Sequence, residues 1–189
     1  MRVEGDKMKN CKVIGKSLKK SLMMGGLCVL MLCGCSSKEK EQCEENVSAF
    51  LEAYQSKDET CGKYLSGNEK DANVEFEGFQ SVLADPITFE IKSVEVNKEY
   101  SIVNVVITNV DFEAVFEGLV NDDLKVDSTE SIALELEKRL QADDAPMREF
   151  EVPVKLNEEQ KIEMSSELSN ALLGGYAQYI YELTEGDVQ

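Results

Sequence analysis

The chain has 189 residues, of which 37 are acidic and 20 are basic, and its formal net charge is −17. A protein this negative repels the phosphates of nucleic acids and anionic lipid head groups, so we expect no nucleic-acid partner. The sequence contains no histidine, which excludes Ser-His-Asp and Cys-His catalysis and the usual nitrogen ligands of zinc. We predict no catalytic residue set, no metal site and no cofactor.

The first 34 residues have the three-part layout of a secretory signal. Several lysines precede an apolar stretch from Leu22 to Leu32. This stretch is too short to cross a hydrocarbon core about 30 Å thick, which takes ~20 apolar residues. We therefore predict a signal peptide over residues 1–34. Met8 is an alternative start to Met1, because the Glu-Gly pair upstream of it is compatible with a ribosome-binding sequence in the gene.

The end of this segment resembles the lipobox of bacterial lipoproteins, in which a leucine and two small residues precede a cysteine. The matching residues are Leu32, Cys33, Gly34 and Cys35. The resemblance implies cleavage between Gly34 and Cys35 and attachment of a diacylglycerol to the sulfur of Cys35. It also implies an anchor in the cell membrane on the extracytoplasmic face, as in Gram-positive bacteria.

The rest of the chain, residues 35–189, is more acidic than the whole. The signal contains 7 basic and 2 acidic residues, which leaves 13 basic and 35 acidic residues and a net charge of −22. Residues 35–44 are polar and are predicted to form the lipidated N-terminus and an extended tether. A single domain over residues 45–186 follows, because a chain of this length builds one hydrophobic core.

Two cysteines besides Cys35 remain, Cys43 and Cys61. In an extracytoplasmic protein a disulfide is the first expectation. A helix over residues 45–57 would separate its ends by roughly 20 Å, and the four residues that follow can return at most ~14 Å. The geometry therefore predicts no bond between Cys43 and Cys61, because a disulfide needs Cα atoms within ~7 Å of each other.

Three helical segments are predicted first. In the helix over residues 45–57, apolar side chains recur at helical spacing and form one stripe: Val47, Phe50, Leu51 and Tyr54. A short second piece contains Cys61, Tyr64 and Leu65. A third helix over residues 74–83 is stopped by Pro86.

The apolar period then changes to the alternation typical of strands. Residues 87–96 alternate with one change of phase, which predicts a bulged strand. Residues 100–110 are rich in β-branched side chains on both faces and are expected to form a central strand. Asp111 stands where the N-cap of the next helix belongs, and the buried stripe of that helix is Phe112, Val115, Phe116 and Leu119.

The last part of the chain is predicted to hold a helix near residues 130–140 and a strand over 150–156. Pro153 cannot donate a ladder hydrogen bond, so it marks an edge or an unpaired position. A short strand at 161–164 leads into a final helix over 166–183, with inward residues Leu168, Leu172, Tyr176, Tyr179 and Leu183. The order of elements predicts an α+β domain in which a curved antiparallel sheet packs on helices.

A glycine pair and two acidic clusters stand out in this part of the chain. Gly174-Gly175 interrupt the final helix, and we expect close packing of helix on sheet in preference to a hinge or a ligand approach. On that ground Gly175→Leu would destabilise the domain. Two acidic clusters lack the ligand spacing of a calcium loop and are interpreted as solvated charges; they are Asp122-Asp123 with Asp127, and Asp143-Asp144.

Two segments resemble small Gram-positive lipoproteins of uncharacterised function. They are VVITNVDFEAVFEGL, from Val105 to Leu119, and KIEMSSELSNALLGG, from Lys161 to Gly175. The resemblance implies a cystatin-like or nuclear-transport-factor-2-like fold, in which a bent sheet wraps helices into a cone with a cavity. It implies no particular substrate, because one fold serves many functions.

Different classes of function are compatible with these observations. The favoured one is a non-enzymatic module that binds a surface protein or a small apolar ligand. The alternative is a small-molecule enzyme of isomerase type with Asp/Tyr acid–base chemistry, whose candidate cavity residues are Asp111, Tyr176 and Tyr179. A helix cap and core packing explain the same three residues more simply. The solute receptor of a transporter ranks last, because such receptors usually have two lobes.

Overall fold

The computed structural model describes residues 37–67, 74–121 and 129–185. All of them belong to one compact unit, Gly34–Gln189. The signal segment, the lipobox with Cys35, and the acidic cluster of Asp122, Asp123 and Asp127 lie outside the described residues. In the part of the chain that is described, no helix combines the length and the hydrophobicity needed to cross a bilayer.

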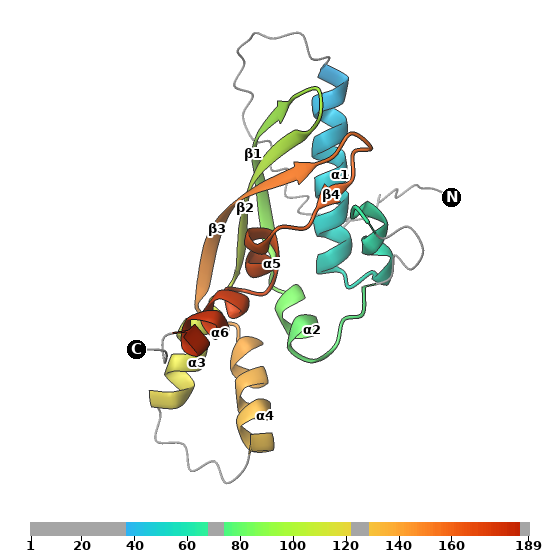
Figure 1. Ribbon diagram of the computed structural model, residues 1–189. Helices are drawn as coiled ribbons and strands as arrows, with labels where there is room; N and C mark the ends of the chain where they lie inside the picture. Colours follow the sequence, from blue (N-terminus) through green and yellow to red (C-terminus); the bar gives the residue numbers. More distant parts are fainter. Residues whose placement is uncertain (1–36, 68–73, 122–128, 186–189) are drawn as a thin grey trace, which may run out of the picture. The chain divides into compact units, whose positions relative to one another are not determined.

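The architecture is α+β, as predicted, with one open four-stranded antiparallel sheet in the order β1-β2-β3-β4 (Figure 1). In chain order the elements are α1 (Ser37–Gln55), the 3₁₀ helix η1 (Glu59–Tyr64), α2 (Gly78–Ala84), β1 (Thr88–Val96), β2 (Ser101–Val110), α3 (Phe112–Asn121), α4 (Thr129–Leu140), β3 (Met147–Leu156), β4 (Ile162–Glu163), α5 (Ser166–Leu172) and α6 (Tyr176–Glu185).

The sheet follows the sequence pattern closely. β2 is central, between β1 and β3, as its β-branched residues predict. The bulge expected in β1 is present as a register shift between Ile91 and Ser93. Pro153 pairs with Asn104 of β2, while β4 reaches only Lys155 and Leu156 on the other side of β3. Pro153 therefore lies where β3 has no outer partner among the described strands. At such a position a residue without a backbone N–H leaves no acceptor on a neighbouring strand unpaired.

One face of the sheet is covered by α1 and α5. The alternate residues Val103, Val105 and Ile107 of β2 point into this main core, together with Phe50 of α1 and Leu168 of α5. All five are essentially inaccessible to solvent. Burying a side chain of this size stabilises the fold by about 1.5–3 kcal/mol, so this layer accounts for much of the domain's stability.

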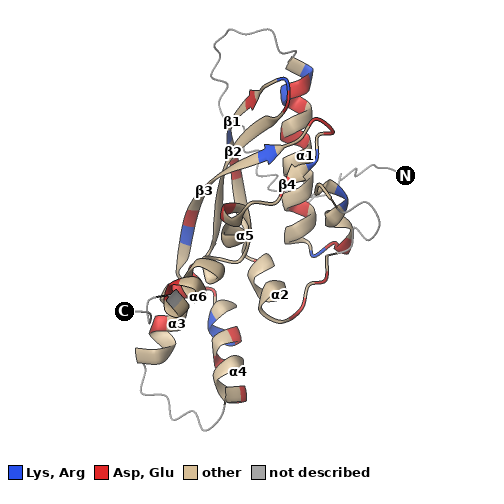
Figure 2. Cartoon of the chain, in the orientation of Figure 1, with Lys and Arg blue, Asp and Glu red and all other residues tan. Residues whose placement is uncertain are grey.

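The opposite face of the sheet points away from α1 and α5 and is charged. Acidic residues outnumber basic ones on the elements drawn in Figure 2. Glu90 pairs with Lys92 at 2.6 Å, and Lys155 pairs with Glu163 at 2.8 Å. These four side chains are all at least 40 % exposed, so each pair contributes at most about 1 kcal/mol.

A second, smaller hydrophobic cluster lies where α2, α3, α4 and α6 meet. Its centre is the Phe112 ring, which the Tyr176 ring meets edge-on at 4.8 Å between centroids. Phe79, Phe116 and Tyr179 lie 6.0–6.5 Å from the same ring. The aromatic contacts give this end of the domain a core of its own.

Two predicted helices have different bounds in the structure. α1 begins at Ser37, so residues 37–44 form its first turns and the expectation of an extended tether there is wrong. The reason is Cys43, which is fully buried in the main core and holds the helix in register before the apolar stripe begins. The third helix is shorter than predicted, because residues 74–77 are not helical and α2 starts at Gly78.

The predicted final helix is broken into α5 and α6. Gly174 and Gly175 both have positive φ, +59° and +86°, a conformation that ends a helix and that L-residues rarely adopt. A Cβ on Gly174 would lie 2.2 Å from the carbonyl oxygen of Val110, whereas a Cβ on Gly175 would have ordinary contacts of 3.7 Å or more. The predicted close approach therefore exists at Gly174. Leu183, predicted to point inward, is half exposed on α6.

Candidate functional site

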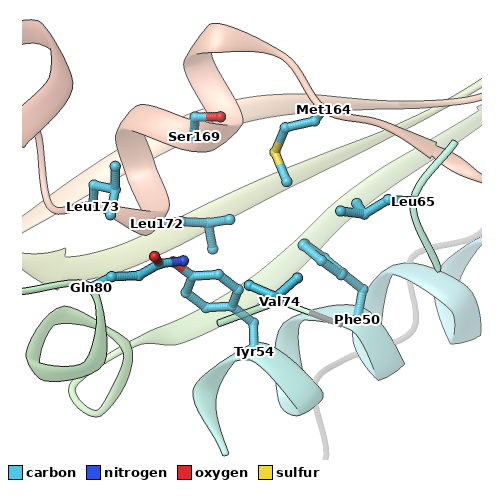
Figure 3. A pocket seen from close by; sticks show the side chains of 9 residues that line it. All are labelled: Phe50, Tyr54, Leu65, Val74, Gln80, Met164, Ser169, Leu172 and Leu173. Atoms are coloured by element: carbon cyan, nitrogen blue, oxygen red, sulfur yellow. The ribbon is translucent and has the colours of Figure 1, made fainter. Parts of the chain in front are cut away.

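A pocket of about 160 Å³ opens beside α1, between α2 and α5 (Figure 3). Six of its nine lining residues are apolar or aromatic without a polar group. The full lining is Phe50, Tyr54, Leu65, Val74, Gln80, Met164, Ser169, Leu172 and Leu173. The residues come from segments far apart in sequence that the fold brings together.

Tyr54 forms the wall of this pocket on α1. It belongs to the apolar stripe predicted from the sequence, and its side chain is 4 % exposed. The Phe76 ring meets its ring edge-on at 5.0 Å between centroids, and the Phe50 ring lies at 6.1 Å. These contacts fix the ring in place, so the hydroxyl is held in one position rather than free to swing.

The Tyr54 hydroxyl is partnered on its acceptor side. It accepts a hydrogen bond of 3.4 Å from the side-chain amide of Gln80, on α2. Burial raises the pKa of Tyr54 above 10.0, so the hydroxyl stays protonated at physiological pH. Its own hydrogen is therefore available for a further bond.

A third polar group lies across the pocket. Ser169 projects from α5, near Met164 and opposite Tyr54 and Gln80 (Figure 3). Its hydroxyl makes no hydrogen bond to any residue that the structure describes, although it can both donate and accept. None of the nine lining residues is charged.

A larger hollow of about 500 Å³ lies on the charged face of the sheet. Its walls include Lys92, Glu151 and Pro153, which are all exposed, and Asn104, which already donates to the Ser93 hydroxyl at 2.9 Å. This hollow lacks buried polar groups that converge on one point. The Tyr54 pocket is the better candidate, because few polar groups in an apolar cavity are typical of ligand sites.

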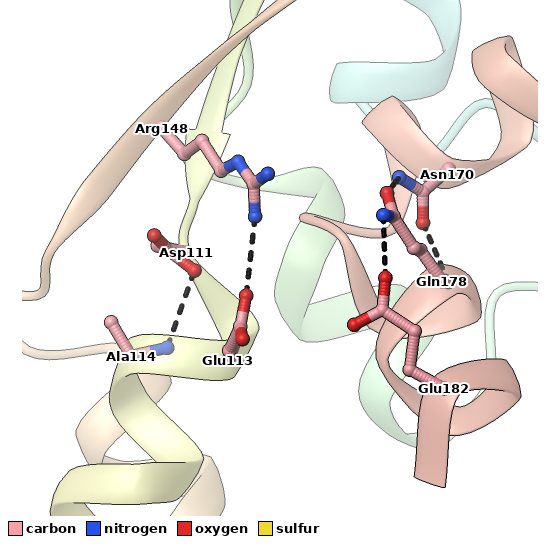
Figure 4. Close-up of polar contacts among 7 residues, drawn as sticks. All are labelled: Asp111, Glu113, Ala114, Arg148, Asn170, Gln178 and Glu182. Atoms are coloured by element: carbon pink, nitrogen blue, oxygen red, sulfur yellow. Dashed lines mark hydrogen bonds and ion pairs between the residues drawn. The ribbon is translucent and has the colours of Figure 1, made fainter. Parts of the chain in front are cut away.

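The three candidate cavity residues from the sequence have structural roles. Asp111 caps α3 as predicted, since its carboxylate accepts from the backbone N–H of Ala114 at 3.2 Å (Figure 4). Tyr176 and Tyr179 are half-buried and pack on the Phe112 ring in the second cluster. The structure does not place any of the three in the Tyr54 pocket.

The surroundings of Asp111 and the start of α6 are polar networks on the surface. Glu113 pairs with Arg148 at 3.4 Å. On α6, the backbone N–H of Gln178 donates to the side-chain oxygen of Asn170 at 2.9 Å, and the side-chain amide of Gln178 donates to the Glu182 carboxylate at 2.7 Å (Figure 4). These contacts cap α6 after the glycine break and account for the polar groups without a ligand.

The two cysteines in the described chain are buried, free thiols. Cys43 lies within α1 and not before it as predicted, and its thiol donates to the Gln160 side-chain oxygen at 3.0 Å. Burial raises the pKa of the Cys61 thiol to about 11, which keeps the group protonated and unreactive at neutral pH. The structure thus has no bond between Cys43 and Cys61, as predicted, and equal thiol counts with and without reductant would show the same in solution.

Within the described ranges, no three acidic or cysteine side chains are placed to hold a metal ion. Asp143 and Asp144, one of the acidic pairs, are exposed on the surface. No family model, no characterised protein and no solved structure matches the chain.

Sequence reasoning missed most of the pocket. Tyr54 was identified only as one member of a helical stripe, and Gln80, Met164 and Ser169 carried no signal of their own. Gln80 stands beside Phe79 in a short helix, and a polar residue at such a position is ordinarily solvated. Its hydrogen bond to Tyr54 joins residues 26 positions apart in the chain and follows only from the tertiary fold.

Proposed function

We propose that the protein is a membrane-anchored extracytoplasmic lipoprotein whose domain is a non-enzymatic binding module. The observation that carries the binding role is the Tyr54 pocket, an apolar cavity with polar groups from three helices and no charged lining residue. The anchor rests on the lipobox pattern at Leu32, Cys33, Gly34 and Cys35. The membrane is thus one partner, through Cys35, and a small apolar ligand or a surface protein is the other.

The finer fold assignment is part of the same proposal. An open antiparallel sheet with helices on one face is compatible with a cystatin-like or nuclear-transport-factor-2-like domain. The pocket opens among helices α1, α2 and α5. The proposal that the protein belongs with the small Gram-positive lipoproteins is supported by the two segments that resemble them, residues 105–119 and 161–175.

The isomerase-type alternative gains no support from a specific observation. Acid–base catalysis would need a carboxyl and a tyrosine hydroxyl facing one cavity. Asp111 instead caps α3, and the rings of Tyr176 and Tyr179 pack on Phe112. The binding module therefore remains the function we propose.

The anchor is tested by mass spectrometry of the protein extracted from its own membrane. The wild-type chain should begin at Cys35 and carry the mass of a diacylglycerol, whereas Cys35→Ser should be unprocessed and lack that mass. Cys43→Ser is the matched control and should be lipidated normally. A soluble, unmodified wild-type protein would refute the anchor.

The pocket is tested by placing a photoreactive diazirine analogue of methionine at Met164 or at Met147. Both residues are nearly half exposed, but only Met164 lines the pocket. Irradiation of intact cells should give one defined adduct at position 164, absent at position 147 and lost in Ser169→Phe, which fills the pocket. Equal adducts at both positions would refute a specific site there.

A further inference from the structure

The pocket distinguishes between ligands by charge. None of its nine lining residues carries a charge. An anion would enter without a cationic partner, and the surrounding domain repels it, because residues 35–189 have a net charge of −22. A cation would equally lose its hydration without gaining a carboxylate. Both kinds of ion are therefore disfavoured relative to a neutral molecule.

The pocket also sets an upper limit on size. Its volume of about 160 Å³ lies below the 300–1,000 Å³ of sites for drug-sized ligands. A cavity of roughly 150 Å³ lined by apolar side chains is large enough for a benzene ring. The apolar part of the occupant is therefore about the size of one aromatic ring.

The polar groups decide which functional group the occupant presents. The oxygen of the Tyr54 hydroxyl already accepts from Gln80, so what the hydroxyl offers is its hydrogen. A hydrogen-bond acceptor on the ligand satisfies it, and a carbonyl oxygen is the neutral acceptor best suited to this. Ser169, on the opposite wall, is then left for a second and weaker contact.

We propose that the Tyr54 pocket binds a neutral molecule with one ring-sized apolar body and a carbonyl group that accepts a hydrogen bond from the Tyr54 hydroxyl. The inference rests on the proposed binding function and adds the chemical class of the ligand. It makes Tyr54 the residue that selects for the carbonyl, while Phe50, Leu65 and Leu172 provide the apolar surface.

Three small probes of similar shape test the proposal: phenylacetamide, phenylacetate and ethylbenzene. Binding is measured from the shift of the Met164 methyl resonance, with the full chain reconstituted in lipid nanodiscs at pH 7.5. Phenylacetamide should bind at least about tenfold more tightly than the ionised phenylacetate. Tyr54→Phe should weaken phenylacetamide about three- to tenfold and leave ethylbenzene unchanged.

Two controls separate the possible failures. Tyr181→Phe removes a hydroxyl from an exposed tyrosine outside the pocket and should change no affinity. Ser169→Phe should abolish binding of all three probes. If Tyr54→Phe affects all probes equally while Ser169→Phe abolishes binding, the proposed ligand class is wrong, but the pocket is still a binding site. If no probe binds, or Ser169→Phe has no effect, the proposed function itself is overturned.

Discussion

Asn109 joins the central strand β2 to the helix α5. It is fully buried in β2. Its side-chain amide donates to the carbonyl oxygens of Ala171 and Leu172, at 3.1 and 3.0 Å, and its side-chain oxygen accepts from the N–H of Val110 at 2.7 Å. One residue thus satisfies backbone groups at the C-terminal end of α5, where a helix lacks internal partners.

Replacing Asn109 by aspartate removes both donors and aims a carboxylate at two carbonyl oxygens. We expect Asn109→Asp to lower the free energy of unfolding by about 2–4 kcal/mol, measured by urea denaturation. Asn104→Asp is the matched control on the same strand, since Asn104 faces solvent. Its effect should stay within about 1 kcal/mol, and equal losses in both variants would contradict the role of Asn109.

Both the backbone conformation at position 174 and the space around it require a glycine, and a control at Gly78 separates the two requirements. The φ of Gly174 is positive, and a Cβ there would meet the Val110 carbonyl oxygen at 2.2 Å. Gly78 also has a positive φ, but a Cβ there would meet open space. We expect Gly78→Ala to destabilise by about 1–2 kcal/mol and Gly174→Ala by at least about 3 kcal/mol, in the same denaturation assay. Equal losses would show that the close approach is unimportant.

The helix α1 begins at Ser37, eight residues before the start at residue 45 that the sequence predicts. Glu41 is exposed and lies in the second turn, where a proline would remove a helical hydrogen bond. Glu41→Pro should therefore destabilise the domain by about 1–3 kcal/mol. Ser37→Pro, at the first helical position, should be neutral. If residues 37–44 were an extended tether, both variants would be neutral in thermal unfolding.

The sequence alone predicts an element correctly where the periodicity of its apolar residues or a single capping residue determines it. The stripe of Val47, Phe50 and Tyr54, the central β2 and the Asp111 cap all follow from residues within a few positions. The start of α1 does not, because the residues before Cys43 are polar. The long-range contact in this stretch is made by the Cys43 thiol, which donates to Gln160, 117 residues away in the chain.

The candidate site was unpredictable for the same physical reason. Tyr54, Gln80 and Ser169 lie on three different helices, and only the tertiary fold brings them to one pocket. No spacing within one segment encodes that geometry. The residues that the sequence did single out, Asp111 and Tyr176, satisfy local caps and core contacts instead.

The pH changes the stability of the whole domain through two buried ionisable groups, the Cys61 thiol and the Tyr54 hydroxyl, and through its net charge. Burial raises the pKa of Cys61 to about 11 from 9.0, and that of Tyr54 above 10.0. Because folding raises these values, the stability that they contribute is complete below pH 9 and is lost as the pH rises toward 11. Deprotonation also adds negative charge to a chain that already carries −17.

The midpoint of thermal unfolding should therefore fall steadily between pH 9 and pH 11. Cys61→Ala removes one of the buried acids, so its midpoint should fall less steeply than that of the wild type over this interval. The comparison is of slopes, which allows for a lower starting stability of the variant. A flat profile, or identical slopes, would contradict the assigned shift.

The early start of α1 also bears on where the domain meets other molecules. Only Ser36 separates Cys35 from the first residue of the helix. Tyr54 lies about 25 Å along the helix from Ser37, at 1.5 Å per residue. With Cys35 acylated as proposed, the pocket is confined to a thin layer above the bilayer. An extended stretch over residues 37–44 would span roughly 26 Å in place of about 12 Å as helix, and would let the pocket reach about 14 Å further. Confinement to a thinner layer raises the effective concentration of other molecules anchored in the same membrane around the pocket.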